Sequence, residues 1–170
     1  LPYPNDMTEL VRLALAVEIA NPRVAEPVLL DMALVGPHEA GKLVIQDPVR
    51  EVRIAAARAL GTLSFTSARA PLESILNSKS IREMDRQEKL AYFEAFGRLA
   101  GAEGVPLLDR ILNARSWLGG GESPELRACA ALGLARIRHP SARDALSTAA
   151  NDSDPVVRSA VARALRGETS

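Results

Sequence analysis

The feature that most constrains this 170-residue chain is a sequence motif that recurs along it. The clearest copy is DPVVRSAVARALRG at residues 154–167, and looser copies are PELRACAALGLA at 124–135 and REVRIAAARALG at 50–61. Each copy places a basic residue seven positions before a leucine, and KLAYFEAFG at 89–97 repeats this spacing with a phenylalanine. The basic positions advance by 36, 38 and 31 residues, a period that indicates a helical solenoid.

The motif itself has the pattern of an α-helix, with a start signal before it and a stop signal after it. Asp154 is expected to cap the helix by accepting a hydrogen bond from an unpaired backbone N–H group, and Pro155 suits the first helical position. Gly167 is expected to end the helix. An apolar stripe at helical spacing would face the core, and its members are Val157, Ala160, Val161, Ala164 and Leu165.

A second helix is expected at a fixed distance after each complete copy. Twelve residues separate the last core residue of the first helix from a leucine of the second, and an asparagine follows five residues later. One such helix is marginal in water, and a pair still exposes an apolar face, so stability requires stacked pairs. The core pairs are Leu60 with Leu72, Phe96 with Leu108 and Leu134 with Leu146, and the asparagines, expected as helix C-caps, are Asn77, Asn113 and Asn151.

The pattern predicts an all-α solenoid in one domain, residues 1–170, with about four and a half helix pairs. Residues 1–46 are expected to hold a degenerate N-terminal repeat and an insert, because Leu10 stands at the basic position there. Full repeats are expected at 47–82, 83–122 and 123–152, followed by a terminal half repeat at 153–170.

The motif P-x-x-R-x-x-A-x-x-A-L, followed by a second helix, resembles HEAT repeats, and in particular the short bacterial type also found in phycobilin lyases. The resemblance covers residues 47–167 well and 1–46 poorly. It implies an armadillo-type, right-handed superhelix with the first helices on the convex side and the second helices lining the concave side. The residues that carry it are Pro124, Arg127, Ala130, Ala131 and Leu134 in one copy, and Pro155, Arg158, Ala164 and Leu165 in the next.

Charge and composition disfavour several classes of function. The chain has 21 basic and 21 acidic residues, whereas nucleic-acid binders usually carry a basic excess, so we expect no nucleic-acid partner. No apolar run reaches membrane-spanning length and no signal peptide is visible, so we expect no membrane insertion and a cytoplasmic, bacterial protein. Because the chain starts at Leu1 rather than at Met, we expect it to be part of a longer or processed chain.

The sequence offers few groups for catalysis. Two families that resemble this fold, deoxyhypusine hydroxylases and alkylpurine DNA glycosylases, need a set of convergent metal ligands and a basic groove respectively. The histidines are His38, beside Glu39, and His139, which precedes a helix and suits a surface or capping role. The sole cysteine, Cys129, stands among apolar neighbours on a predicted helix and is expected to be buried. We therefore expect a protein that is not an enzyme and holds no metal or cofactor.

The four repeated basic residues have two interpretations. In the first they form a surface for an acidic partner. In the second, which we favour, each reaches a carboxylate or carbonyl at a neighbouring turn, such as those near Asp47, Asp152 or Asp154, because a residue kept at one register in every unit usually links the units. The four residues, named here the basic ladder, are Arg53, Lys89, Arg127 and Arg158.

We expect a non-catalytic scaffold that binds a protein partner in the concave groove formed by helices near 67–78, 102–115 and 140–151. Mixed charges in such a groove give specificity and steering more than affinity. The alternative is a lyase-like or accessory protein that handles a small cofactor or pigment, for which a deep apolar pocket is expected. The candidate groove residues are Arg69, Glu73, Asp109, Arg110, Arg143 and Asp144.

The loop RSWLGGGES at residues 115–123 is a second candidate surface. It carries the sole tryptophan, Trp117, beside Leu118. In one interpretation Trp117 folds back over the end of the 102–115 helix and seals a seam between repeats. In the other, Trp117 and Leu118 stand on the rim of the solenoid as an anchor for a partner, a role in which tryptophan is enriched.

Overall fold

The computed structural model describes residues 50–62, 64, 66–114 and 120–167. These residues form α-helices and short 3-10 turns, and no strand occurs among them. The predicted all-α solenoid is therefore confirmed. The degenerate repeat expected at residues 1–46 lies outside the described residues.

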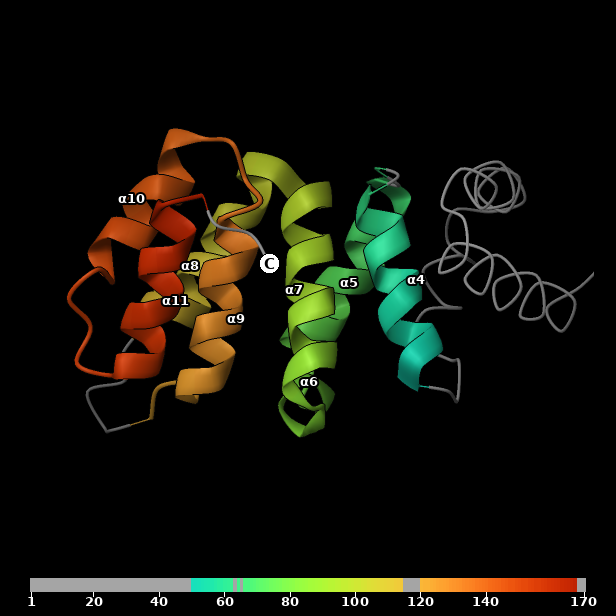
Figure 1. The fold of residues 1–170 in the computed structure, drawn as a ribbon. Coiled ribbons are helices and arrows are strands. Elements are labelled where there is room, and N and C mark those ends of the chain that lie inside the picture. The colour runs from blue at the N-terminus through green and yellow to red at the C-terminus, as the bar shows by residue number, and fades with distance from the viewer. Residues whose placement is uncertain (1–49, 63, 65, 115–119, 168–170) are drawn as a thin grey trace, which may run out of the picture.

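The helices form two layers (Figure 1). In one layer the first helices of the repeats stand in a row, and each packs against the next along the chain. Each helix of the second layer packs against the first helix of the following repeat. The first helices are α4 (Arg50–Thr62), α7 (Arg86–Ala100), α9 (Pro124–Leu134) and α11 (Pro155–Leu165), and the second helices are α5 (Arg69–Asn77), α8 (Val105–Asn113) and α10 (Pro140–Thr148).

The ends of α11 are those predicted from the sequence. The Asp154 carboxylate accepts hydrogen bonds from the backbone N–H groups of Val156 and Val157, at N–O distances of 2.8 and 3.3 Å. Pro155 occupies the first turn. Gly167 follows the helix with a φ angle of 71°, a left-handed conformation that glycine adopts without steric cost.

Three short elements were not predicted. The 3-10 turns η1 (Thr66–Ala68) and η2 (Gly101–Gly104) lead directly into α5 and α8, and α6 (Ser80–Glu83) stands just before α7. Ile81, at the centre of α6, is completely buried. A single apolar anchor of this kind holds a one-turn helix that is too short to show helical periodicity in the sequence.

The expectation that the repeated asparagines cap the second helices is wrong. Asn77 and Asn113 are the last helical residues of α5 and α8, and the capping residues that follow are extended. Their side chains instead link neighbouring second helices. The Asn113 amide donates to the carbonyl oxygen of Ala145 at 3.0 Å, and Asn77 Oδ1 accepts from Arg110 at 3.0 Å.

The hydrophobic core runs without interruption from one repeat to the next. Its largest members lie in α7, where Tyr92, Phe93 and Phe96 are each at most 1% exposed. Around them the core is built from alanine and aliphatic side chains. These small side chains let the helices approach closely, which compensates for the low aromatic content of 4%.

Two glycines set the distance between α7 and α9. A Cβ atom on Gly97 would lie 2.2 Å from the carbonyl oxygen of Gly133, and one on Gly133 would lie 2.9 Å from the carbonyl oxygen of Phe93. The two backbones are therefore in direct contact at this crossing. At the preceding seam, a Cβ on Gly61 would lie 3.0 Å from the Cα of Ala95, so the same register position permits close approach in both repeats.

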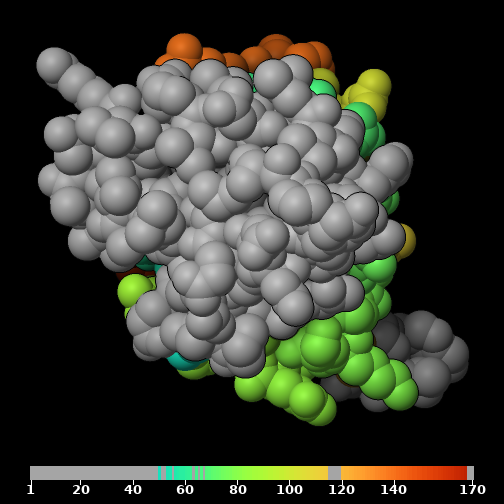
Figure 2. All heavy atoms as spheres, turned by 90° about the vertical axis from the view of Figure 1, so that its right-hand side faces the viewer, coloured from blue at the N-terminus to red at the C-terminus, as the bar shows by residue number. Residues whose placement is uncertain are grey.

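Figure 1 shows the two ends of the first helices, with α6 at the lower edge and the segment between α9 and α10 at the upper edge. In Figure 2 described atoms with the green of α6 and α7 appear at the lower edge, and atoms with the orange of the α9–α10 region appear at the upper edge. Because the first helices run in the same direction, the basic ladder near their N-terminal ends lies toward the α6 edge. Their C-terminal halves lie toward the opposite edge.

Replacing Gly97 with alanine should destabilise the protein, because the new methyl group meets a backbone carbonyl that has no room to move. We expect a loss of about 1–3 kcal/mol in the free energy of unfolding, the usual cost of overpacking, measured by urea denaturation. Gly121→Ala is the matched control, since its Cβ would lie 3.8 Å from the nearest atom, the oxygen of Ala114. Equal unfolding midpoints for the two variants would contradict direct backbone contact at the seam.

Candidate functional site

The basic ladder links consecutive first helices near their N-terminal ends. Arg53 of α4 donates to both carboxylate oxygens of Glu88 in α7, at 2.6 Å from Nε and 3.2 Å from Nη2. Lys89 of α7 donates from Nζ to Oε1 of Glu125 in α9 at 3.0 Å. Each cation therefore meets an acid in the first turn of the next first helix.

Arg127 of α9 joins three elements. Its Nε donates to the carbonyl oxygen of Leu112 in α8 at 2.8 Å, and its two terminal nitrogens pair with the Asp152 carboxylate in the turn before α11. The backbone N–H of Asp154 also donates to Asp152. Arg158 of α11 donates to the carbonyl oxygens of Asp152 and Ser153, at 2.7 and 2.9 Å. Asp152 is thus the junction between the last two first helices.

The contacts of the ladder are those of the structural interpretation, since every member has an acceptor within the chain. Asp152 is one of the three acidic residues considered as partners; Asp154 caps α11 instead, and Asp47 lies outside the described residues. Glu88 and Glu125 were missed. They stand one and two residues before the next ladder position, while Asp152 stands six before it, and this changing offset conceals the pairing in the sequence.

Some of the candidate groove residues form side-chain hydrogen bonds or ion pairs with other residues, here called linked, and others form none within the described part of the chain. Arg69 pairs with Glu103 of the next repeat, Arg110 donates to Asn77, and Asp109 accepts from Asn113 at 2.7 Å. Arg143 and Asp144 of α10 are exposed, and Glu73 of α5 is partly buried. The second-helix layer therefore presents both charges, with the unlinked pair at its C-terminal end.

A pocket of about 730 Å³ opens beside the ends of α5 and α8. Arg110 is the groove candidate that lines it, together with Asn77, while Arg82 and Glu122 form an ion pair within its wall. The six candidates are thus spread along the second-helix layer rather than gathered in this pocket. The rim-loop candidates, Trp117 and Leu118, lie outside the described residues.

The cysteine and the histidine that were considered as candidate catalytic groups have structural roles in the fold. Cys129 is buried, and burial raises the pKa of its thiol to about 12, with a further contribution from Glu125. His139 caps α10 by accepting from the N–H of Ser141 at 3.2 Å, which confirms its predicted role. Across the described ranges, no three His, Cys, Asp or Glu side chains gather as a metal site, and His38 and Glu39 lie outside these ranges. No helix in the described part is long and apolar enough to cross a bilayer.

The thiol of Cys129 should react with a disulfide reagent such as DTNB only when the structure opens. Its raised pKa keeps it protonated at pH 8, and the thiolate is the reactive form. We expect slow labelling of the native protein at pH 8, and a labelling rate that increases in parallel with the loss of helical circular dichroism in denaturant. Rapid labelling without denaturant would show that the seam around α9 is open.

Removing Arg127 should cost much more stability than removing Arg69. The Arg127–Asp152 pair is buried, with side chains 13% and 2% exposed, whereas those of Arg69 and Glu103 are 35% and 72% exposed. We expect Arg127→Met to lose about 3–5 kcal/mol, the cost of leaving a buried charge unpaired. Arg69→Met should lose at most about 1 kcal/mol. Similar losses in chemical denaturation would refute the assignment of Asp152 as a junction.

Comparison with known proteins bears on the repeat. Residues 111–169, which contain α9, α10 and α11, match a family model described as HEAT repeats. A search of curated proteins found no match. The sequence motif of α9 and α11 recurs in α4 and α7, which stack in the same layer. Residues 111–169 are therefore assigned to HEAT repeats, and α4 and α7 continue the same repeat pattern.

Proposed function

We propose that the chain is a non-catalytic scaffold that binds a protein partner along the exposed face of α5, α8 and α10. HEAT repeats commonly act as protein-interaction scaffolds, and stacked repeats create extended binding surfaces. One observation carries the assignment to this layer: in each second helix that the structure describes, the positions two residues before and two after the core leucine are exposed. They hold Ala70 and Ser74 in α5, Pro106 and Arg110 in α8, and Asp144 and Thr148 in α10.

The rigidity of the array supports this assignment. The first helices are joined by the basic ladder and by direct backbone contact, so their buried polar groups are already paired. The second helices are joined through Asn77 and Asn113, which lie at the helix ends. Asn77 takes Arg110 as its partner, and the other exposed positions are not used in these links. A surface held in place before binding loses little conformational entropy when a partner docks.

The chemistry of the exposed positions indicates the kind of partner. Arg110, Arg143 and Asp144 put both signs of charge beside small side chains such as Ala70 and Ser74. A protein surface with complementary charges fits such a face, and the charges select the partner and speed association. The pocket beside α5 and α8 has the ion pair of Arg82 and Glu122 in its wall, a lining that suits a polar peptide better than a pigment or other planar apolar cofactor.

Reversing two exposed charges should strongly reduce partner capture without unfolding the protein. We expect Arg110→Glu combined with Arg143→Glu to reduce recovery of a specific protein about tenfold or more, because arginine is enriched among the residues that dominate interfaces. Capture from a lysate of the source cell with quantitative mass spectrometry measures the effect. The melting temperature should stay nearly constant, since exposed substitutions change stability by about 0.5 kcal/mol or less.

The matched control reverses Arg86 and Arg138, which are exposed on the first helix α7 and on the turn after α9. This control carries the same change in net charge. Proteins retained by the control and lost with the second-helix variant identify the partner and the surface together. A captured set that is identical for all three proteins would place the binding surface elsewhere.

A further inference from the structure

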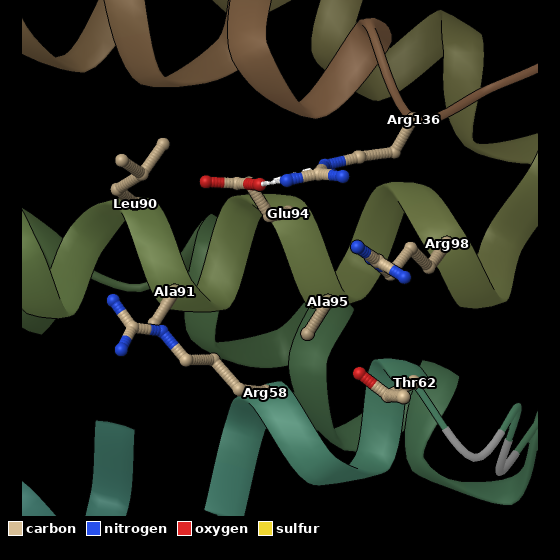
Figure 3. Close-up of a pocket in the computed structure, with 8 residues that line it drawn as sticks. All are labelled: Arg58, Thr62, Leu90, Ala91, Glu94, Ala95, Arg98 and Arg136. Atoms are coloured by element: carbon tan, nitrogen blue, oxygen red, sulfur yellow. Dashed lines mark hydrogen bonds and ion pairs between the residues drawn. The ribbon is translucent and has the colours of Figure 1, made fainter. Parts of the chain in front are cut away.

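A second pocket lies on the opposite layer, along the central and C-terminal parts of α4 and α7 (Figure 3). It has a volume of about 430 Å³. Helices α4 and α7 form most of its wall, and the turn after α9 closes one side. The lining residues are Arg58, Thr62, Leu90, Ala91, Glu94, Ala95, Arg98 and Arg136.

The pocket carries an excess of positive charge. Three arginines and one glutamate line it. Arg136 pairs with Glu94, with an Nε–Oε2 distance of 2.7 Å and side chains that are 14% and 17% exposed. Arg58 and Arg98, by contrast, have no hydrogen bond or ion pair with any part of the chain that the structure describes. Two guanidinium groups therefore remain available to a ligand.

The surroundings of Arg98 reinforce this point. The pKa of Arg98 lies below its ordinary value, because burial and then the charge of Arg136 disfavour a second cation there. Glu94 acts in the opposite direction but is engaged with Arg136. An anion placed beside Arg98 in the pocket would offset the repulsion between Arg98 and Arg136. In Figure 3 the hydroxyl of Thr62 lines the same space and offers a neutral donor.

The repeat itself explains why the cations meet here. Arg58 and Glu94 both stand five residues after a ladder position, and Thr62, Arg98 and Arg136 all stand nine residues after one. Stacking brings these equivalent positions side by side. Gly61 allows the approach, because a Cβ atom on it would lie 3.2 Å from the Cδ of Arg98.

We propose that this pocket binds a phosphate monoester. Arginine presents a planar fork of donors that matches phosphate oxygens two at a time. A phosphate monoester carries about −1.5 to −2 charges at pH 7, which balances the excess of three arginines over one glutamate. The monoester belongs either to a small phosphorylated metabolite or to a phosphorylated side chain of a protein. The site lies on the layer opposite the proposed scaffold surface and stands independently of it.

Titration calorimetry of the full chain with phenyl phosphate, at constant ionic strength set with chloride, tests the proposal. We expect saturable binding that weakens about tenfold or more in Arg58→Gln combined with Arg98→Gln, because the double variant loses two positive charges and the charge-assisted hydrogen bonds that they donate to the phosphate. The control, Arg86→Gln combined with Arg138→Gln, removes two exposed cations outside the pocket and should leave the affinity within about twofold of the parent. Dimethyl phosphate, a monoanion, should bind more weakly than phenyl phosphate to the parent protein.

A second variant distinguishes ligand binding from a purely structural role. Glu94→Gln removes the acid that occupies Arg136, so it should tighten phenyl phosphate binding several-fold. A structural role, in which the arginines serve the ends of their own helices, predicts lower stability and no gain in affinity. Absence of binding by the parent protein, or equal binding by the Arg58 and Arg98 variant, overturns the site.

Two further ligands distinguish a phosphorylated protein from a small phosphate compound as the source of the phosphate. A Gly-phosphoserine-Gly peptide that binds about tenfold tighter than inorganic phosphate assigns the site to a phosphorylated protein. Equal affinities assign it to small phosphate compounds. Both results depend on the loss of affinity in the Arg58 and Arg98 variant, and without that loss neither source is supported.

Discussion

Close backbone contact between neighbouring first helices is the constraint on which the rest of the structure depends. Where α7 crosses α9, the carbonyl of Gly133 occupies the space that a side chain on Gly97 would need. The helices are thus as near as their backbones permit, and dispersion contacts are made along the whole seam. Small residues hold the equivalent positions at the other seams, so the helices stack with one repeated register. These equivalent pairs are Gly61 with Ala95 and Ala135 with Ala164.

The short distance between neighbouring first helices buries polar groups near the seam, and these groups then need partners. Glu88, Lys89 and Asp152 are removed from water when the helices stack, and each is paired with a neighbouring element. Among the described residues, no buried side-chain nitrogen or oxygen lacks a partner. Buried ion pairs add little to stability compared with apolar packing, but an unmatched charge is costly. The ladder therefore acts against stacking in a wrong register, in which its cations would lose their acceptors.

The same residue type takes two roles according to its place on the first helices. Near the α6 edge, arginines such as Arg127 are linked to acids and carbonyls of the adjoining repeat. Toward the opposite edge, Arg58 and Arg98 line a pocket whose one acid, Glu94, is paired with Arg136. The second-helix layer differs from both, because its exposed positions carry either sign of charge beside small side chains. One repeating framework thus offers two chemically distinct surfaces.

The sequence by itself determined the main helices, their order and the two ends of α11, since these depend on neighbours a few residues away, such as Asp154 and Gly167. It also identified the basic ladder, although not its acids. Only the tertiary structure decided that the asparagines link second helices, that α6 is anchored by Ile81, and that Arg58 and Arg98 share a pocket. The contacts behind these findings join residues as far apart as 42 positions, as in the Arg136–Glu94 pair. Such partners are chosen by the distance and rotation between stacked helices, and these are fixed only when the whole array buries its apolar faces together.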